Sequence, residues 1–165
     1  MRATRIWVTA LIVAVLAMQP AIAQNKAAIS KSVSDFNKLS LGFSTSLSEL
    51  SKRSGTAAPN DKEMLKLVIS QLSIVNATTD GVLDLGSVAA EVRDAGDLAI
   101  VKKHLTTRCS ALKSLAEATA KYVDSVASNI AAVAIAAEVT KARELLIQMG
   151  QHSLCNPATH DRLDE

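Results

Sequence analysis

The sequence predicts an all-α protein, an up-down four-helix bundle that follows a cleaved signal peptide. Apolar residues recur at steps of three and four over most of the chain, as they do on one face of a helix. The three prolines leave no interior stretch rich in proline. A chain of 165 residues with 48% hydrophobic and 21% charged residues is typical of one globular domain.

Residues 1–23 have the pattern of a secretory signal peptide. Arg2 and Arg5 precede an apolar run over residues 6–18, and Ala21-Ile22-Ala23 is a small-x-small cleavage site. The run is about 13 residues long, which is short for a membrane span. We expect cleavage after Ala23, no transmembrane segment in the mature chain, and a periplasmic or secreted protein of bacterial type. An uncleaved N-terminal anchor is the alternative.

The first helix is expected from about Asn25 to Ser54, with Gly55 as its stop. Its stripe steps by four and three through Ile29, Val33, Phe36, Ser40, Phe43, Leu47 and Leu50. Leu39 can join the buried edge, but Leu41 lies about 200° away around the helix and should be exposed. We therefore treat Leu41, beside the small Gly42, as a candidate partner-binding residue. The alternative is an isolated surface leucine.

The second helix is expected from Asn60 to about Arg93, with Asn60 as its N-cap and Glu63 as the capping-box partner. Poor helix formers follow one another before Gly81, so a break there is the alternative to one long helix. The expected buried stripe is Leu65, Val68, Leu72, Val75, Thr79, Val82, Gly86 and Ala89.

Two further helices are expected between Asp97, as N-cap, and Gly150. A turn over Asp124–Asn129 should divide them, because one helix of this length could not be covered by the first two; the undivided helix is the alternative. Their stripes are Leu98, Val101, Leu105, Leu112, Leu115, Thr119 and Val126, and then Ile135, Val139, Ala142, Leu146 and Met149. The bundle domain would then cover residues 24–155, and residues 156–165 would form a polar, mobile tail.

Cys109 and Cys155 are the only cysteines, and an even number in an exported protein predicts a disulfide. In an up-down bundle the start of the third helix and the end of the fourth lie at the same end. The alternative is a zinc site formed by these cysteines with His104 and His152. His104 and Cys109 are five residues apart and so do not share a helix face, which disfavours that site. His160 lies in the tail and is expected at the surface.

The chemistry of the sequence favours a binding protein over an enzyme. Without Arg2 and Arg5 the 18 basic residues become 16, against 16 acidic residues, so no basic footprint for nucleic acid remains. No catalytic motif, phosphate loop or cofactor signature occurs. We expect an exported, non-catalytic module that binds an unknown protein partner, without a cofactor. A carrier of a small apolar ligand between helices and an enzyme with an unrecognised site are the alternatives.

Overall fold

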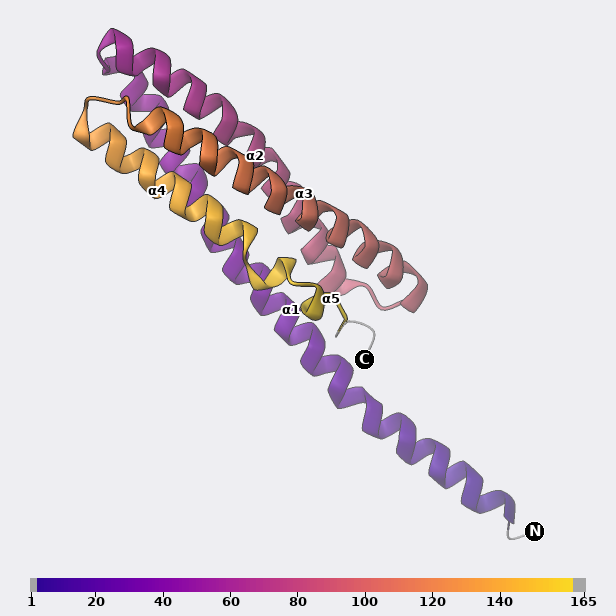
Figure 1. The fold of residues 1–165 in the computed structure, drawn as a ribbon. Helices are drawn as coiled ribbons and strands as arrows, with labels where there is room; N and C mark the ends of the chain where they lie inside the picture. The colour runs from indigo at the N-terminus through magenta and orange to yellow at the C-terminus, as the bar shows by residue number, and fades with distance from the viewer. Residues whose placement is uncertain (1–2, 162–165) are drawn as a thin grey trace.

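Four long helices pack antiparallel around one apolar core (Figure 1). The structure is a computed structural model that describes the backbone of residues 3–161 and the side chains of residues 26–161. The helices are α1 (Ala3–Thr56), α2 (Pro59–Glu91), α3 (Ala95–Ala127) and α4 (Val133–Gly150). Contacts join α1 to α2, α2 to α3, α3 to α4 and α4 back to α1, so the helices close around the core. The predicted four-helix bundle is confirmed.

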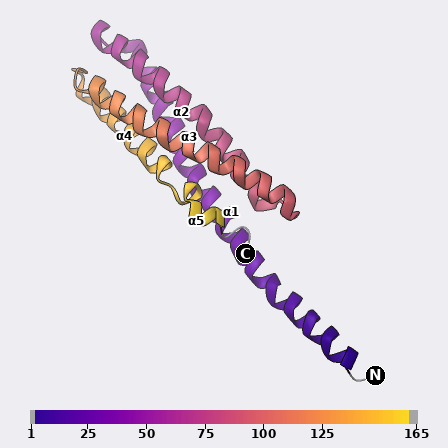
Figure 2. The same ribbon diagram turned by 45° about the vertical axis from the view of Figure 1, so that its right-hand side comes forward.

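The N-terminal part of α1 extends beyond the other helices (Figure 2). The first described side chain of α1 that is buried in the bundle is Ile29, at 2% exposure. The side chains of the expected signal peptide, residues 1–23, lie outside the described residues, and its removal stays a prediction. Within the part of the chain that the structure describes, no helix is both long and apolar enough to cross a membrane.

Most of the core comes from the predicted apolar stripes, and it also includes Ala116, Ala120 and Val123 of α3, and Leu154 beyond α4. Steps of three and four keep a stripe on one side of a helix, so each helix turns its stripe inward. On α1, Phe36 and Phe43 are fully buried, whereas Val33 and Leu47 pack partly buried against the core. All eight predicted positions of α2 and all five of α4 are buried.

The start of α2 differs from the prediction. The helix begins at Pro59, so the expected cap Asn60 lies inside it and makes no capping hydrogen bond. Proline suits the first position because it lacks the N–H group that would otherwise stay unpaired. Asp61 is buried, and its Oδ1 and Oδ2 accept hydrogen bonds from the N–H groups of Ala131 (3.0 Å) and Ala132 (3.1 Å). This carboxylate therefore caps the chain where it enters α4.

The start of α3 also differs, because Asp94 and not Asp97 is its N-cap. The Asp94 carboxylate accepts hydrogen bonds from the N–H groups of Gly96 (2.8 Å) and Asp97 (3.0 Å). Asp94 keeps an extended backbone, so the helix starts at the next residue and places Asp97 in its first turn. The preceding helix α2 runs without a break through Gly81, so the alternative of two shorter helices there is wrong.

A turn divides α3 from α4, as preferred from the sequence, and the alternative of one long helix is wrong. Helix α3 ends at Ala127 and α4 begins at Val133, so the turn lies slightly later in the chain than the expected Asp124–Asn129. The Nη2 atom of Arg143 donates a hydrogen bond of 2.7 Å to Oδ2 of Asp124 and so ties α4 to the end of α3.

Residues 153–161 are more ordered than the polar, mobile tail expected from residue 156 onward. They form a short 3-10 helix, η1 (Ser153–Cys155), and a one-turn helix, α5 (Pro157–Asp161). His160 was expected at the surface, but it is buried at 2% exposure. The reason is that α5 packs against α3 and η1, so one side of this short helix faces the bundle.

Candidate functional site

Helix α4 stops well short of the end of the bundle at which α2 ends and α3 begins. It has 18 residues, whereas α2 and α3 have 33 each. At 1.5 Å per residue it is about 22 Å shorter. Residues 151–161, which we call the C-terminal segment, continue from its end (Figure 1). Leu154 of this segment is fully buried, and a Cβ atom built on Gly86 would lie 3.2 Å from a Leu154 methyl and 3.0 Å from Val33. Leu154 thus packs against α1 and α2, where a longer α4 would otherwise lie.

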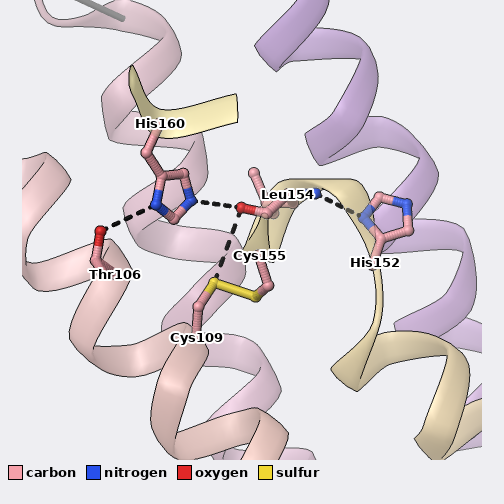
Figure 3. The surroundings of a disulfide bond; sticks show 6 residues. All are labelled: Thr106, Cys109, His152, Leu154, Cys155 and His160. Carbon is pink, nitrogen blue, oxygen red and sulfur yellow. Dashed lines mark hydrogen bonds between the residues drawn. A yellow bond between two sulfur atoms is a disulfide. The ribbon is translucent and has the colours of Figure 1, made fainter. Parts of the chain in front are cut away.

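A disulfide joins the C-terminal segment to α3. It links Cys109 to Cys155, with the two Cα atoms 5.1 Å apart (Figure 3), and so confirms the predicted pair. The Cys109 sulfur also lies 3.8 Å from the carbonyl oxygen of Leu154. A disulfide sulfur carries no proton, so we regard this approach as a packing contact and not as a hydrogen bond. The bond restricts the unfolded chain and keeps the segment on α3.

His160 adds a second link at the same place (Figure 3). Its Nε2 lies 2.6 Å from the carbonyl oxygen of Leu154, and its Nδ1 lies 2.9 Å from Oγ1 of Thr106 on α3. A carbonyl oxygen only accepts hydrogen bonds, so Nε2 carries the proton and donates it. In the neutral ring Nδ1 then accepts from the Thr106 hydroxyl. Both ring nitrogens are therefore occupied by contacts within the chain.

His152 lies on the opposite side of Leu154, against α1 (Figure 3). Its Nδ1 accepts a hydrogen bond of 3.1 Å from the Leu154 N–H group. Its ring packs edge-on against Phe36, with the ring centroids 5.3 Å apart. Burial lowers the pKa of His152 below its ordinary value of 6.5, and the charge of Asp35 opposes this shift. The ring serves to position the backbone of η1.

An open hollow of about 310 Å³ lies beside the disulfide. It offers one ammonium group, one imidazole and two carboxamides, on side chains from α3 and the C-terminal segment. The lining residues are Lys113, Gly150, Gln151, His152, Cys155, Asn156 and Pro157. Cys155 is held in the disulfide, and no carboxylate lines the hollow next to the imidazole. The lining therefore lacks the paired nucleophile and base that covalent catalysis needs.

The alternative zinc set is not brought together. Cys109 and Cys155 are bonded to each other, so neither offers the thiolate that zinc binds. His104 is exposed on α3, whereas Cys109 is buried there. Among the described residues, no group of three or more His, Cys, Asp or Glu side chains is placed to hold a metal ion.

Leu41 is exposed, as expected, at 60%. Leu39 is partly buried against the core, which confirms how the two leucines divide between core and surface. Gly42 does not widen the surface around Leu41, because a Cβ atom built there would lie 3.7 Å from Leu145 of α4. The residues three or four positions from Leu41 are polar: Asn37, Lys38, Ser44 and Thr45. Leu41 is thus a single apolar side chain in a polar surface, and whether it binds a partner stays untested.

The outer surface of α2 has a larger apolar feature that the sequence reasoning missed. Leu67, Ile74 and Val88 are exposed at 52%, 51% and 45%. With Gly81 they are seven residues apart, so they follow one line along the outside of the helix. We call Leu67, Ile74, Gly81 and Val88 the outer α2 stripe. The seven-residue spacing was visible in the sequence, but the buried stripe of the same helix was sufficient to explain an amphipathic pattern.

The residues around the stripe are also unusual in charge. No charged residue occurs from Leu67 to Thr79, over more than three helical turns. Exposed ion pairs lie elsewhere, Asp35–Lys38 and Glu49–Lys52 on α1 and Glu63–Lys66 on α2 just before the stripe. The imidazoles of His152 and His160 bond within the chain, whereas the stripe presents side chains to solvent. The stripe is therefore the candidate functional site.

No protein-family model, no characterised protein and no solved structure matches this chain.

Proposed function

We propose that this protein is an exported, non-catalytic interaction module that binds a protein partner through the outer α2 stripe. The observation that carries the proposal is the set of three half-exposed large apolar side chains along one line of α2, which has no charged residue from Leu67 to Thr79. Exposed apolar side chains gathered in one area favour association, whereas single ones are ordinary on protein surfaces. The stripe has the spacing with which helices pack on helices, so a helical partner fits it best.

Two observations support export. The first 23 residues have the pattern of a signal peptide. The disulfide between Cys109 and Cys155 is consistent with an oxidising compartment, since such bonds persist there and are rare in the cytosol.

The hollow beside the disulfide supports the carrier alternative less well than the stripe supports binding of a protein. A carrier of an apolar ligand needs an apolar cavity. Lys113, Gln151 and Asn156 make the lining of this hollow partly polar.

The test places a photo-crosslinking residue at position 74 or at position 73 in the protein as its own organism exports it. Ser73 is the matched control because it is exposed on the same turn but points about 100° away. We expect one defined protein adduct from position 74 and none from position 73. Equal adducts at both positions, or none at either, would refute the proposal.

Two substitutions sharpen the test. Ile74→Lys should leave the free energy of unfolding within about 0.5 kcal/mol, as surface changes usually do, and should abolish partner binding. Leu41→Asp should leave both the free energy of unfolding and partner binding unchanged if the stripe is the binding surface. Loss of binding in Leu41→Asp with retention in Ile74→Lys would move the binding surface to α1.

A further inference from the structure

We propose that the occupant of the outer α2 stripe is a second copy of this chain, with the two α2 helices packed antiparallel around a two-fold axis. This inference rests on the proposed function, because it names the partner at the same surface. A two-fold axis brings the same patch of both copies together, so the patch must be complementary to itself. Its shape and its charge can each be checked for that property.

The shape is complementary in the antiparallel direction. The axis would pass between positions 77 and 78, midway along the stripe, so Ile74 of one copy would face Gly81 of the other. Leu67 would likewise face Val88. A large side chain would therefore enter the space that glycine leaves. In a parallel pair, glycine would face glycine and leave a void.

Gly81 has no evident purpose within a single chain. Glycine inside a helix is less stable than alanine because it costs more backbone entropy on folding. Apart from its own stretch of helix, none of the described residues lies within 4 Å of a Cβ atom built at Gly81, so no neighbour among them requires its small size. Its φ angle is not positive, so the backbone does not require glycine either. A side chain from a second copy would supply the missing reason.

The charges favour the same direction. Asp80, Asp84 and Glu91 make the second half of α2 acidic, whereas its first half is uncharged from Leu67 onward and has Lys66 at its edge. Antiparallel pairing sets the acidic half against the uncharged half and brings Glu91 toward Lys66. Parallel pairing would set each acidic residue against its own copy, which is repulsive.

The size of the contact predicts its strength. From Leu67 to Val88 the helix rises about 32 Å, and a helix with its side chains is about 10 Å wide. One helix pair of this length buries less surface than a standard stable interface. We therefore expect a weak, reversible dimer with a dissociation constant in the micromolar range.

The test is sedimentation equilibrium on the mature protein with its disulfide intact, at concentrations up to about 500 µM. Wild type should dimerise. Gly81→Lys should weaken the dimer at least tenfold. Its thermal unfolding at low concentration should occur no lower than that of wild type, because a Cβ atom at this helical position meets none of the described residues outside its own stretch of helix within 4 Å. Ser73→Lys adds the same charge away from the stripe and should change the dissociation constant less than twofold.

A cross-link tests the register. Ala77 is exposed beside the proposed axis, so Ala77→Cys should join two copies through a short bis-maleimide. Ala137→Cys, at an exposed position of α4, should not join them. A dimer that Gly81→Lys leaves intact, or that cross-links equally at both positions, would overturn the inference.

A wild-type protein that stays monomeric would also overturn it. The proposed function would then still stand if position 74 forms an adduct with a different protein. The proposed function would fail as well if position 74 forms no adduct. Failure of the dimer alone can therefore be distinguished from failure of the proposed function.

Discussion

Replacing Asp61 with alanine should destabilise the fold by about 2–3 kcal/mol. The carboxylate is only 4% exposed, and it accepts hydrogen bonds from the N–H groups of Ala131 and Ala132. Hydrogen bonds to a charged group contribute about 1.5–3 kcal/mol each. We take a total below twice that range, because Ala131 is exposed and water can replace part of the interaction. Helix α4 has no side-chain cap of its own, so the loss is not compensated nearby.

Urea unfolding followed by circular dichroism measures this change. Asp61→Asn keeps one carbonyl oxygen as an acceptor and should lie between alanine and wild type. Asp80→Ala removes an exposed carboxylate from the same helix and should cost less than about 0.5 kcal/mol. Amide hydrogen exchange should speed up first at Ala131 and Ala132. If Asp61→Ala stays within 0.5 kcal/mol of wild type, the idea that Asp61 stabilises the entry to α4 is wrong.

Three further predictions follow from buried groups. The Ser46 hydroxyl is buried without a hydrogen-bond partner, so Ser46→Ala should raise the free energy of unfolding by about 1 kcal/mol; a decrease in the urea midpoint would contradict this. Replacing Cys109 and Cys155 by serine should lower the free energy of unfolding by about 4 kcal/mol, which is the loop-entropy value for the observed separation of 46 residues. The reduced wild type and the variant should then have the same urea midpoint. Burial lowers the pKa of His152, so the unfolded chain takes up that proton first as the pH falls. Stability should therefore be full above pH 6.5 and decline below it toward the lower folded pKa, and His152→Gln should flatten that decline; an unchanged pH profile in the variant would show that His152 is not its source.

The spacing of apolar residues predicted the four long helices and most of their buried residues, and the cysteine count predicted the disulfide. Burial along a helix follows a local rule, because spacing alone decides which residues share a face. That rule placed Phe36 and Phe43 in the core and separated Leu39 from Leu41. The disulfide could be predicted because two cysteines allow one pairing and the up-down order brings the helix ends together. The spacing also puts Leu67 and Ile74 on one line of the second helix. Whether another helix of the bundle covers that line became clear only when the neighbouring helices were placed.

Contacts between residues far apart in the chain became apparent only once the helices were packed together. Asp61 caps residues about 70 positions away, a partner that no local pattern reveals. His160 is buried because α4 ends early and the C-terminal segment continues along α3 as far as Thr106. The same path places Leu154 on Gly86, which is why a small residue fits there. Periodicity reports which face of a helix is buried, whereas these contacts depend on helix lengths and on where each chain segment ends, and those are set by the packing of the whole bundle.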